Sequence, residues 1–340
     1  NPSVSGVDKF GYSTGSVANN HALPGLALKY DFTEQFSGAL IYDQAYGADV
    51  YYPTATDGGS PLLGGTSAKL NSYGLTALAR YKFNDNFSVH GGIRLSKASA
   101  QVKLGGLAYG LAFNPADPNT YRSFNGYEVE LANDWGTGYV IGAAYEKPEI
   151  ALRVALTYFS KVSHKFDSVE TLPGGAAAQL GVATLDAITQ TDTPQAVNLD
   201  VQTGIAPGTL LFASARWVDW SELKVAPDKF FGPNSGSLTN LEDTTTYTLG
   251  IGRKFNDNWS GSAFVTYEPS GDPLVSPLAP TNGMKGIGIA AVYTRDNMKI
   301  TMGARYLKLG DAQPQTLQTA RADMTGNHAV AVGVKVGFSF

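Results

Sequence analysis

A six-residue turn motif occurs three times in the chain and restricts its fold more than any other feature. The copies, at 32–37, 83–88 and 255–260, are short polar turns with an aromatic residue on each shoulder. Apolar residues alternate with small or polar ones on both sides. This two-residue period around a polar turn predicts β-hairpins. Aromatics at one height on several hairpins indicate a shared boundary, as at the water–lipid interface of a transmembrane β-barrel.

The C-terminal segment carries the same alternation up to the last residue. Small or polar residues separate its large apolar ones, which are Val330, Val332, Val334, Val336, Phe338 and Phe340. A soluble sheet that packs one face on a core could show this pattern. The repeated aromatic turns favour the barrel, and the terminal aromatic resembles the end of bacterial outer-membrane barrels.

Composition excludes several other classes of protein. Apolar residues make up 43% of the 340 residues, but no run approaches the roughly 18 apolar residues that a membrane helix needs. The absence of Cys excludes disulfides, thiolate zinc sites and a Cys nucleophile. A net charge of -4 gives no reason to expect nucleic acid as a partner. The four His residues show no metal-ligand spacing, and no serine-nucleophile or phosphate-loop motif is present. We therefore expect no enzyme, no metal and no cofactor.

The alternating segments predict an all-β fold, a transmembrane antiparallel up-and-down β-barrel of about 14 strands. Turns of about three residues alternate with loops of roughly 12–23 residues, the usual arrangement of periplasmic turns and extracellular loops. No linker is visible, so residues 1–340 are expected to form a single domain. The predicted strands are 2–7, 23–32, 36–52, 67–83, 87–104, 127–146, 150–171, 196–205, 209–220, 244–255, 259–268, 283–294, 298–308 and 327–340.

The period of each strand assigns its side chains to lipid or lumen. Arginines are expected inside, because a charge facing lipid costs about 2–4 kcal/mol at the midplane. Arg253 is an exception: it shares a face with Leu249 and Ile251, but it lies close enough to a turn for its guanidinium to reach the headgroups. The inward arginines share the predicted lumen with large apolar residues, which either fill a narrow barrel or form an apolar pocket. These residues are Leu78, Val140, Phe159, Phe212, Phe264 and Leu307.

The predicted long loops are unusually apolar. One contains Leu107, Tyr109, Leu111 and Phe113; the segment 176–188, which could be a short helix, contains Leu180 and Leu185; a third holds Phe230 and Phe231. Clustered apolar groups on a surface often mark a binding site. The loops could equally pack on one another as a lid.

Three motifs resemble those of a known family. The segment 153–162 (RVALTYFSKV), followed by His164 and Phe166, is similar to a strand of the FadL/TodX family of outer-membrane hydrophobic-compound transporters. The segment 134–146 (DWGTGYVIGAAYE) resembles the strand before it, and 220–223 (WSEL) resembles the end of a later strand. The similarity extends over most of the chain, and the strand count agrees with that family.

The resemblance implies an outer-membrane channel for passive uptake of long-chain fatty acids or other hydrophobic small molecules. Apolar extracellular loops would capture the ligand, and an inner pocket would pass it to a lateral opening at a kink in the third strand, here Ala45, Tyr46 and Gly47. The family's N-terminal hatch is expected to be absent, since 1–3 (NPS) falls at a strand. The alternative is a general or oligosaccharide-type porin for polar solutes.

The expected site combines apolar residues with cations for a carboxylate head group. Lys103 is one candidate cation, and Arg153 and Arg216 lie deeper; either arginine could instead brace the barrel through Asp200, Glu146 or Glu268. The predicted ligand-binding residues are Lys103, Leu107, Tyr109, Leu111, Phe113, Val140, Arg153, Phe159, Leu180, Leu185, Phe212, Arg216 and Phe264. Further expected partners are outer-membrane lipid and lipopolysaccharide. We expect a monomer in the bacterial outer membrane, because a closed barrel has no free edge.

Overall fold

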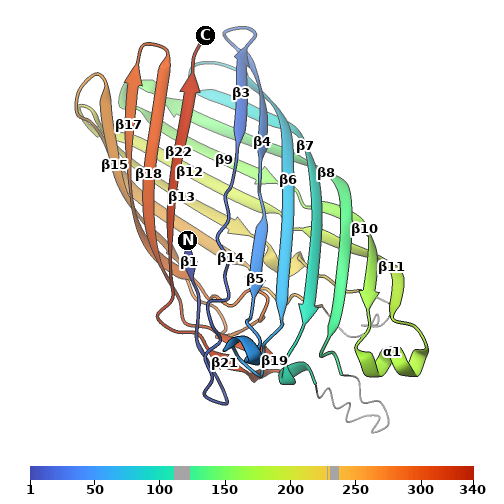
Figure 1. The fold of residues 1–340 in the computed structure, drawn as a ribbon. Coiled ribbons are helices and arrows are strands. Elements are labelled where there is room, and N and C mark those ends of the chain that lie inside the picture. Colours follow the sequence, from blue (N-terminus) through green and yellow to red (C-terminus); the bar gives the residue numbers. More distant parts are fainter. Residues whose placement is uncertain (111–122, 228, 230–236) are drawn as a thin grey trace.

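The computed structural model describes residues 1–110, 123–227, 229 and 237–340, whose strands form the tilted wall of a β-barrel (Figure 1). The wall strands are β3 (Leu26–Asp31), β4 (Phe36–Asp43), β5 (Gly47–Tyr51), β6 (Ser67–Lys82), β7 (Phe87–Leu104), β8 (Tyr127–Lys147), β9 (Leu152–Phe159), β10 (Val162–Thr171), β11 (Thr184–Thr193), β12 (Ala196–Ala206), β13 (Thr209–Val218), β14 (Thr244–Lys254), β15 (Trp259–Glu268), β17 (Met284–Arg295), β18 (Met298–Leu309) and β22 (His328–Phe338).

The remaining elements are short. They are the strands β1 (Pro2–Ser3), β2 (Val7–Asp8), β16 (Leu274–Val275), β19 (Gln313–Thr316), β20 (Thr319–Ala320) and β21 (Ala322–Asp323), the helix α1 (Gly174–Leu180), and the 3-10 turns η1 (Ala55–Asp57), η2 (Leu107–Tyr109), η3 (Pro148–Ile150) and η4 (Trp220–Glu222). None of the helices in the described ranges is long and apolar enough to span a membrane.

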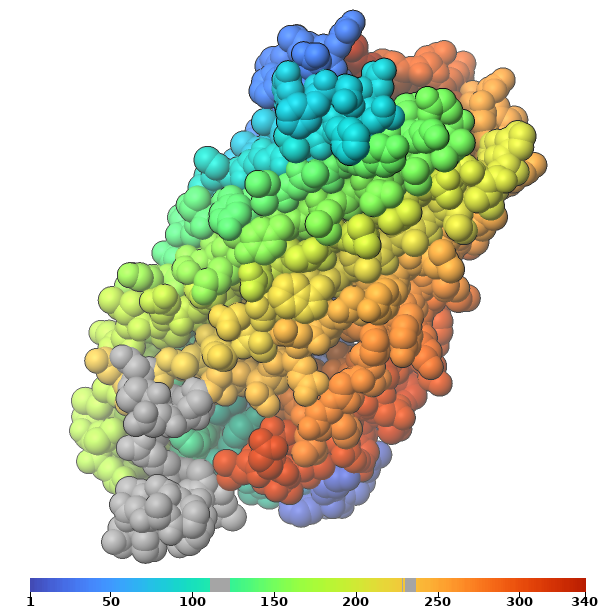
Figure 2. Space-filling view, turned by 180° about the vertical axis from the view of Figure 1, so that it is seen from behind, coloured from blue at the N-terminus to red at the C-terminus, as the bar shows by residue number. Residues whose placement is uncertain are grey.

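Antiparallel pairing connects the wall from β3 round to β22. The sixteen wall strands make thirteen crossings, because β4 with β5, β9 with β10, and β11 with β12 are each one interrupted crossing. β1 pairs with the first residues of β22 and adds a fourteenth strand to the sheet. Within the described part of the chain, no register joins β3 directly to β22. The predicted antiparallel barrel of about fourteen strands is confirmed, and consecutive strands cross Figure 2 as tilted bands.

Side chains build the repeated short turns. Asn84 Oδ1 accepts hydrogen bonds from the backbone N–H groups of Asn86 and Phe87, at 2.9 and 2.8 Å. Asn256 makes the same pair of bonds in the third copy, and a threonine hydroxyl replaces the amide in the first. Such local bonds favour turns over strand continuation. All three copies lie at the end of the barrel that also holds the C-terminus, called here the turn end; the opposite end is the loop end (Figure 1).

The outer face of the wall is apolar and exposed. Val332 and Val334 are 81% and 73% exposed. Neighbouring strands present Ile93, Ile141, Leu156, Leu249, Val265, Ile287 and Ile289 in the same way. A soluble sandwich would bury these side chains in its core, whereas in a membrane barrel they contact the lipid tails.

The inner face is packed in part by rings set against glycines. β13, β14, β15 and β17 pair so that Phe212, Gly250, Phe264 and Gly288 follow one another across the wall. A Cβ at Gly250 would stand 2.3 Å from Phe212 Cζ, and one at Gly288 would stand 2.2 Å from Phe264 Cζ. Each ring therefore lies over the glycine of the next strand.

Ion pairs join three strands on the lumen side. Glu146 Oε2 lies 2.9 Å from an Arg80 guanidinium nitrogen, and Oε1 accepts from Arg153 Nε at 3.0 Å. Arg216 donates to Asn198 Oδ1 at 2.7 Å. The pair of Arg153 with Glu146 considered above is thus present, whereas Arg216 bonds to the amide of Asn198 and not to one of the three carboxylates considered for it.

Two predicted segments differ from the structure. Residues 172–195 were expected to be a loop, but they contain α1 and then β11, which extends the wall by ten residues paired with β10. The short helix expected in 176–188 ends at Leu180, because Gly181 adopts a left-handed φ of 70°. The sequence missed β11 because its exposed polar residues lack the apolar face of the membrane strands.

Candidate functional site

A cavity of about 830 Å³ lies between the wall and the loops at the loop end of the barrel. We call it the loop-side cavity. Its wall side is formed by Ala68, Leu70, Ala98, Ala100, Val102, Leu131 and Phe166, and its loop side by Trp220, Leu223, Val225, Leu274, Val275 and Leu278. The lining is therefore mainly apolar, as in most small-molecule sites.

The inward-facing side chains of β7 are small where they line the loop-side cavity. Ala98, Ala100 and Val102 are successive inward positions on this strand. Small side chains here leave space that larger residues would fill, and the facing loops supply the bulky groups. The small inward residues of β7 thus contribute to the cavity.

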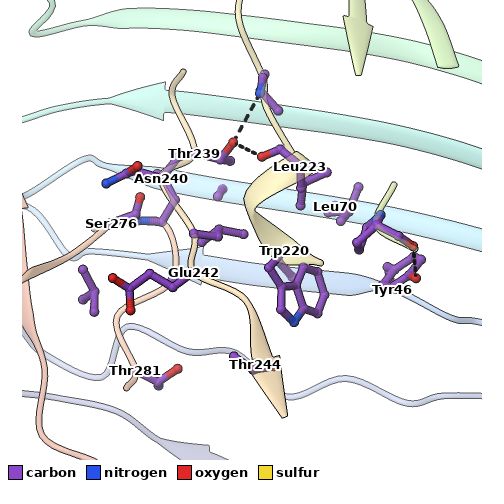
Figure 3. Close-up of a pocket in the computed structure, with 18 of the residues that line it drawn as sticks. Tyr46, Leu70, Trp220, Leu223, Thr239, Asn240, Glu242, Thr244, Ser276 and Thr281 are labelled. Carbon is purple, nitrogen blue, oxygen red and sulfur yellow. Dashed lines mark hydrogen bonds between the residues drawn. The ribbon is translucent and has the colours of Figure 1, made fainter. Parts of the chain in front are cut away.

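Polar groups occupy the side of the cavity formed by the loops. Figure 3 shows Asn240, Glu242 and Ser276 on this side. The carboxylates Glu242, Asp243, Glu268 and Asp272 also line the cavity. Asp272 N donates to Glu242 Oε2 at 3.0 Å, and Thr246 donates to Glu268. No group of three or more His, Asp or Glu that could hold a metal occurs in the described ranges.

Tyr46 and Trp220 lie together at another part of the cavity (Figure 3). Their ring centroids are 5.6 Å apart in an edge-to-face arrangement. Tyr46 stands in the interruption between β4 and β5, and Trp220 begins η4 after β13. Two elements far apart in the sequence therefore meet at this point.

His164 links two of the motifs found in the sequence. Its buried ring stacks on Phe166 at 5.3 Å, and its Nδ1 lies 3.4 Å from Asp134 Oδ2. Gly136 gives this ring room, since a Cβ there would lie 3.1 Å from His164 Cε1. Asp134 faces inward beyond the register shift between β7 and β8. These contacts give a packing reason for Asp134 and Gly136 in the motif at 134–146 and for His164 and Phe166 after the motif at 153–162.

A second buried cluster at the loop end joins the two ends of the chain. Val4 and Val17 pack there with Tyr52, Leu63 and Met324. Burial raises the pKa of the Tyr52 phenol well above its usual range, as it does for Tyr109, which packs on the same cluster. Both phenols therefore remain neutral at ordinary pH.

None of the sequence-predicted loop residues in the described ranges lines the cavity. Lys103 pairs with Glu128 at 3.6 Å, and Leu107 and Leu180 are 57% and 58% exposed. Tyr109 and Leu185 pack on buried clusters. The remaining loop candidates, Leu111, Phe113, Phe230 and Phe231, lie outside the described residues.

The predicted lumen residues form a separate set. Val140 and Phe159 are paired across β8 and β9, and the Arg216 guanidinium lies over the Phe159 ring at 5.7 Å. Phe212 and Phe264 belong to the row of rings and glycines. With Arg153, these residues form the wall away from the loop-side cavity.

Sequence reasoning missed most of the cavity lining. Trp220 and Leu223 belong to a motif that was noted only for its resemblance, and Leu278 lies in a loop with no apparent pattern. The resemblance was the one signal that could have selected Trp220. Ala98 and Ala100 could not be found, because small residues reveal a cavity only when their surroundings are known.

Comparison with known proteins identifies the family. Residues 4–340 match the model of the outer membrane protein transport family OMPP1/FadL/TodX. No curated protein sequence matches the chain.

Three solved structures illustrate the likeness in fold. A Pseudomonas aeruginosa FadL homologue is 18% identical, with a TM-score of 0.75 over 99% of this chain and 85% of its own. The Pseudomonas putida toluene transporter TodX is 12% identical, with a TM-score of 0.63 over 100% and 87% of the chains. The Ralstonia pickettii toluene transporter TbuX is 14% identical, with a TM-score of 0.60 over 100% and 87%.

These findings agree with the lipid-facing wall and the loop-side cavity. They place the protein in the bacterial outer membrane and in transport rather than catalysis. The chain belongs to the OMPP1/FadL/TodX family of outer membrane transport proteins.

Proposed function

We propose that the protein carries small hydrophobic molecules passively across the outer membrane by binding them in the loop-side cavity. The observation that carries this proposal is the mainly apolar lining of a cavity of about 830 Å³, large enough for a drug-sized ligand. Each CH₂ group that leaves water for such a lining gains about 0.8 kcal/mol. Long-chain fatty acids and neutral hydrocarbons both fall within this class.

A lateral route out of the cavity is part of the proposal. Tyr46, Gly47 and Ala48 line the cavity and belong to the interrupted third strand. The ladder to β6 skips the residues between Asp43 and Gly47. A molecule held against this interruption is therefore close to a place where the described wall lacks backbone pairing to β6. The capturing role of the apolar loops, including Leu107 and Leu180, is retained as part of the same proposal.

The test is uptake of a radiolabelled apolar compound into vesicles that contain the purified protein. Leu223→Asp puts a charge on the cavity lining and should reduce binding by about 10-fold or more, since burying a leucine is worth about 1.5–3 kcal/mol. Leu317→Asp is the matched control, because Leu317 is 67% exposed and outside the lining. Equal loss in both variants would contradict the assignment of the cavity.

The same vesicles test the polar-solute alternative. A porin would admit sugars and cause osmotic swelling, whereas a hydrophobic-compound channel would not. Swelling with oligosaccharides, together with no uptake of the apolar compound, would refute the proposed function.

A further inference from the structure

The backbone around Tyr46 is held by a side chain where the strand ladder fails. Tyr46 N donates to Ser72 Oγ at 3.0 Å, and Ser72 Oγ donates to Tyr46 O at 2.6 Å. Ser72 lies on β6, opposite the gap between β4 and β5. One hydroxyl thus satisfies both polar backbone groups of Tyr46. Residues 44–46 therefore take no part in the backbone pairing of β4 and β5 with β6.

The Tyr46 side chain is held by three groups from other parts of the barrel. Its hydroxyl donates to Pro194 O at 3.0 Å, its ring meets Trp220, and the Arg94 guanidinium lies over the ring at 5.8 Å. The residue is only 8% exposed and lines the cavity. The phenol thus closes the cavity on the side of the interrupted strand.

Two charged groups near Tyr46 lack an ionic partner. Arg94 is 7% exposed, and within the described residues no carboxylate oxygen lies within 4 Å of its guanidinium. Asp43 Oδ1 is buried and accepts no hydrogen bond. A buried charge without a hydrogen-bonded partner is costly. Both groups would gain from pairing with each other.

Gly74 leaves the space in which these two groups can meet. A Cβ at this position would stand 2.8 Å from Asp43 Oδ1 and 3.5 Å from Arg94 Nε. The carboxylate and the guanidinium therefore lie on the same side of β6, on either side of the space that a side chain at Gly74 would fill. A small rotation of the Arg94 side chain away from the Tyr46 ring would bring them together.

We propose that Tyr46 is the gating residue of the lateral route, with an Arg94–Asp43 ion pair stabilising the open state. This proposal rests on the proposed function. In the closed state, the phenol is bonded to Pro194 and Arg94 lies over its ring. In the open state, the phenol leaves the cavity wall and Arg94 pairs with Asp43 beside Gly74. The interruption of β4 and β5 then connects the cavity with lipid. Such a two-state element lets a bound ligand shift the equilibrium by displacing Tyr46.

The experiment measures the release rate of a prebound apolar fluorophore from the protein in lipid vesicles. Tyr46→Phe removes the bond to Pro194 and should speed release by about 2- to 10-fold, the range expected for one hydrogen bond. Asp43→Asn removes the ionic partner of the open state and should slow release by a similar or larger factor. Tyr42→Phe is the matched control, because Tyr42 lies on the outer face of β4 and stacks on Tyr73 at 6.2 Å.

Opposite signs for the two variants distinguish gating from a general structural role. Both substitutions preserve shape, and heat-modifiable gel migration reports whether each barrel is folded. If Asp43→Asn does not fold, Gly74→Ala tests the same pairing, because its methyl group occupies the meeting point and should also slow release. The proposal is overturned if Tyr46→Phe releases ligand at the rate of Tyr42→Phe, or if both gate variants change the rate in the same direction. If the wild-type protein binds no apolar fluorophore, the proposed function itself fails.

Discussion

Adding one methyl group at Gly250 should test whether the lumen is packed as the structure describes. A Cβ there would stand 2.3 Å from Phe212 Cζ and 2.6 Å from Phe264 Cβ. Contacts this short require the Phe212 ring to move and the strand that carries Phe264 Cβ to shift, and overpacking of this kind typically costs about 1–3 kcal/mol. The intrinsic preference works the other way, since alanine in a strand is about 0.5–1 kcal/mol more favourable than glycine. The expected net loss for Gly250→Ala is therefore about 0–2.5 kcal/mol.

Gly333 provides the matched control for this change. It lies on β22 and faces the lumen like Gly250, but nothing stands within 4 Å of its Cβ position. Gly333→Ala should thus leave stability unchanged or raise it by up to about 1 kcal/mol. Gly250→Ala is therefore predicted to be less stable than Gly333→Ala.

Urea unfolding of the barrel from lipid vesicles, followed by tryptophan fluorescence, measures both free energies. Phe212→Leu combined with Gly250→Ala should recover part of the loss, because the shorter side chain no longer reaches the added methyl group. Equal effects for Gly250→Ala and Gly333→Ala, or no recovery in the double variant, would refute the packing argument.

Three further predictions concern charge and burial. Val265→Arg places a cation on the lipid face and should lower the unfolding free energy by about 2–4 kcal/mol in vesicles, whereas Ser262→Arg on the lumen face should cost less. Glu146→Gln removes the shared carboxylate of Arg80 and Arg153, so it should lower the urea midpoint more than Glu149→Gln in the exposed turn. Asp323, whose pKa is lowered by the hydrogen bond from Lys9, should stabilise the loop end above its unfolded pKa and lose this effect as pH falls through the lower folded pKa. Proteolysis of the loops at pH 7 and pH 3 would detect this change, and Asp323→Asn should abolish the difference.

The wall could be predicted from the sequence because lipid imposes a strict period on every strand that crosses it. The repeated turns at 83–88 and 255–260 fixed the hairpin positions, and the arginines on the lumen face agreed with the cost of charge in lipid. β11 was not recognised, since it extends beyond the apolar band and its polar residues resemble those of a loop. The two-residue alternation of apolar side chains identifies a strand only where one face of that strand contacts lipid or a packed core.

The site was harder to predict, because a cavity depends on what is absent. Ala98, Ala100 and Gly74 matter through the space they leave, and an isolated sequence does not show which neighbours surround that space. The interruption at 44–46 could be predicted from the broken period near Gly47. The contacts of Tyr46 with Pro194 and Trp220 could not, since they join residues more than a hundred positions apart.

The buried cluster that unites the two ends of the chain sets an order for assembly. Val4 and Val17 pack with Ala322 and Met324, and Lys9 bonds to Asp323 across 314 positions of sequence. Contacts with so large a separation form late, since the loop they close is entropically expensive. The first loop can therefore adopt its native structure only after the last hairpin has formed. A chain that ends shortly before residue 322 would leave an early segment exposed to proteases, even when most of the barrel strands are present.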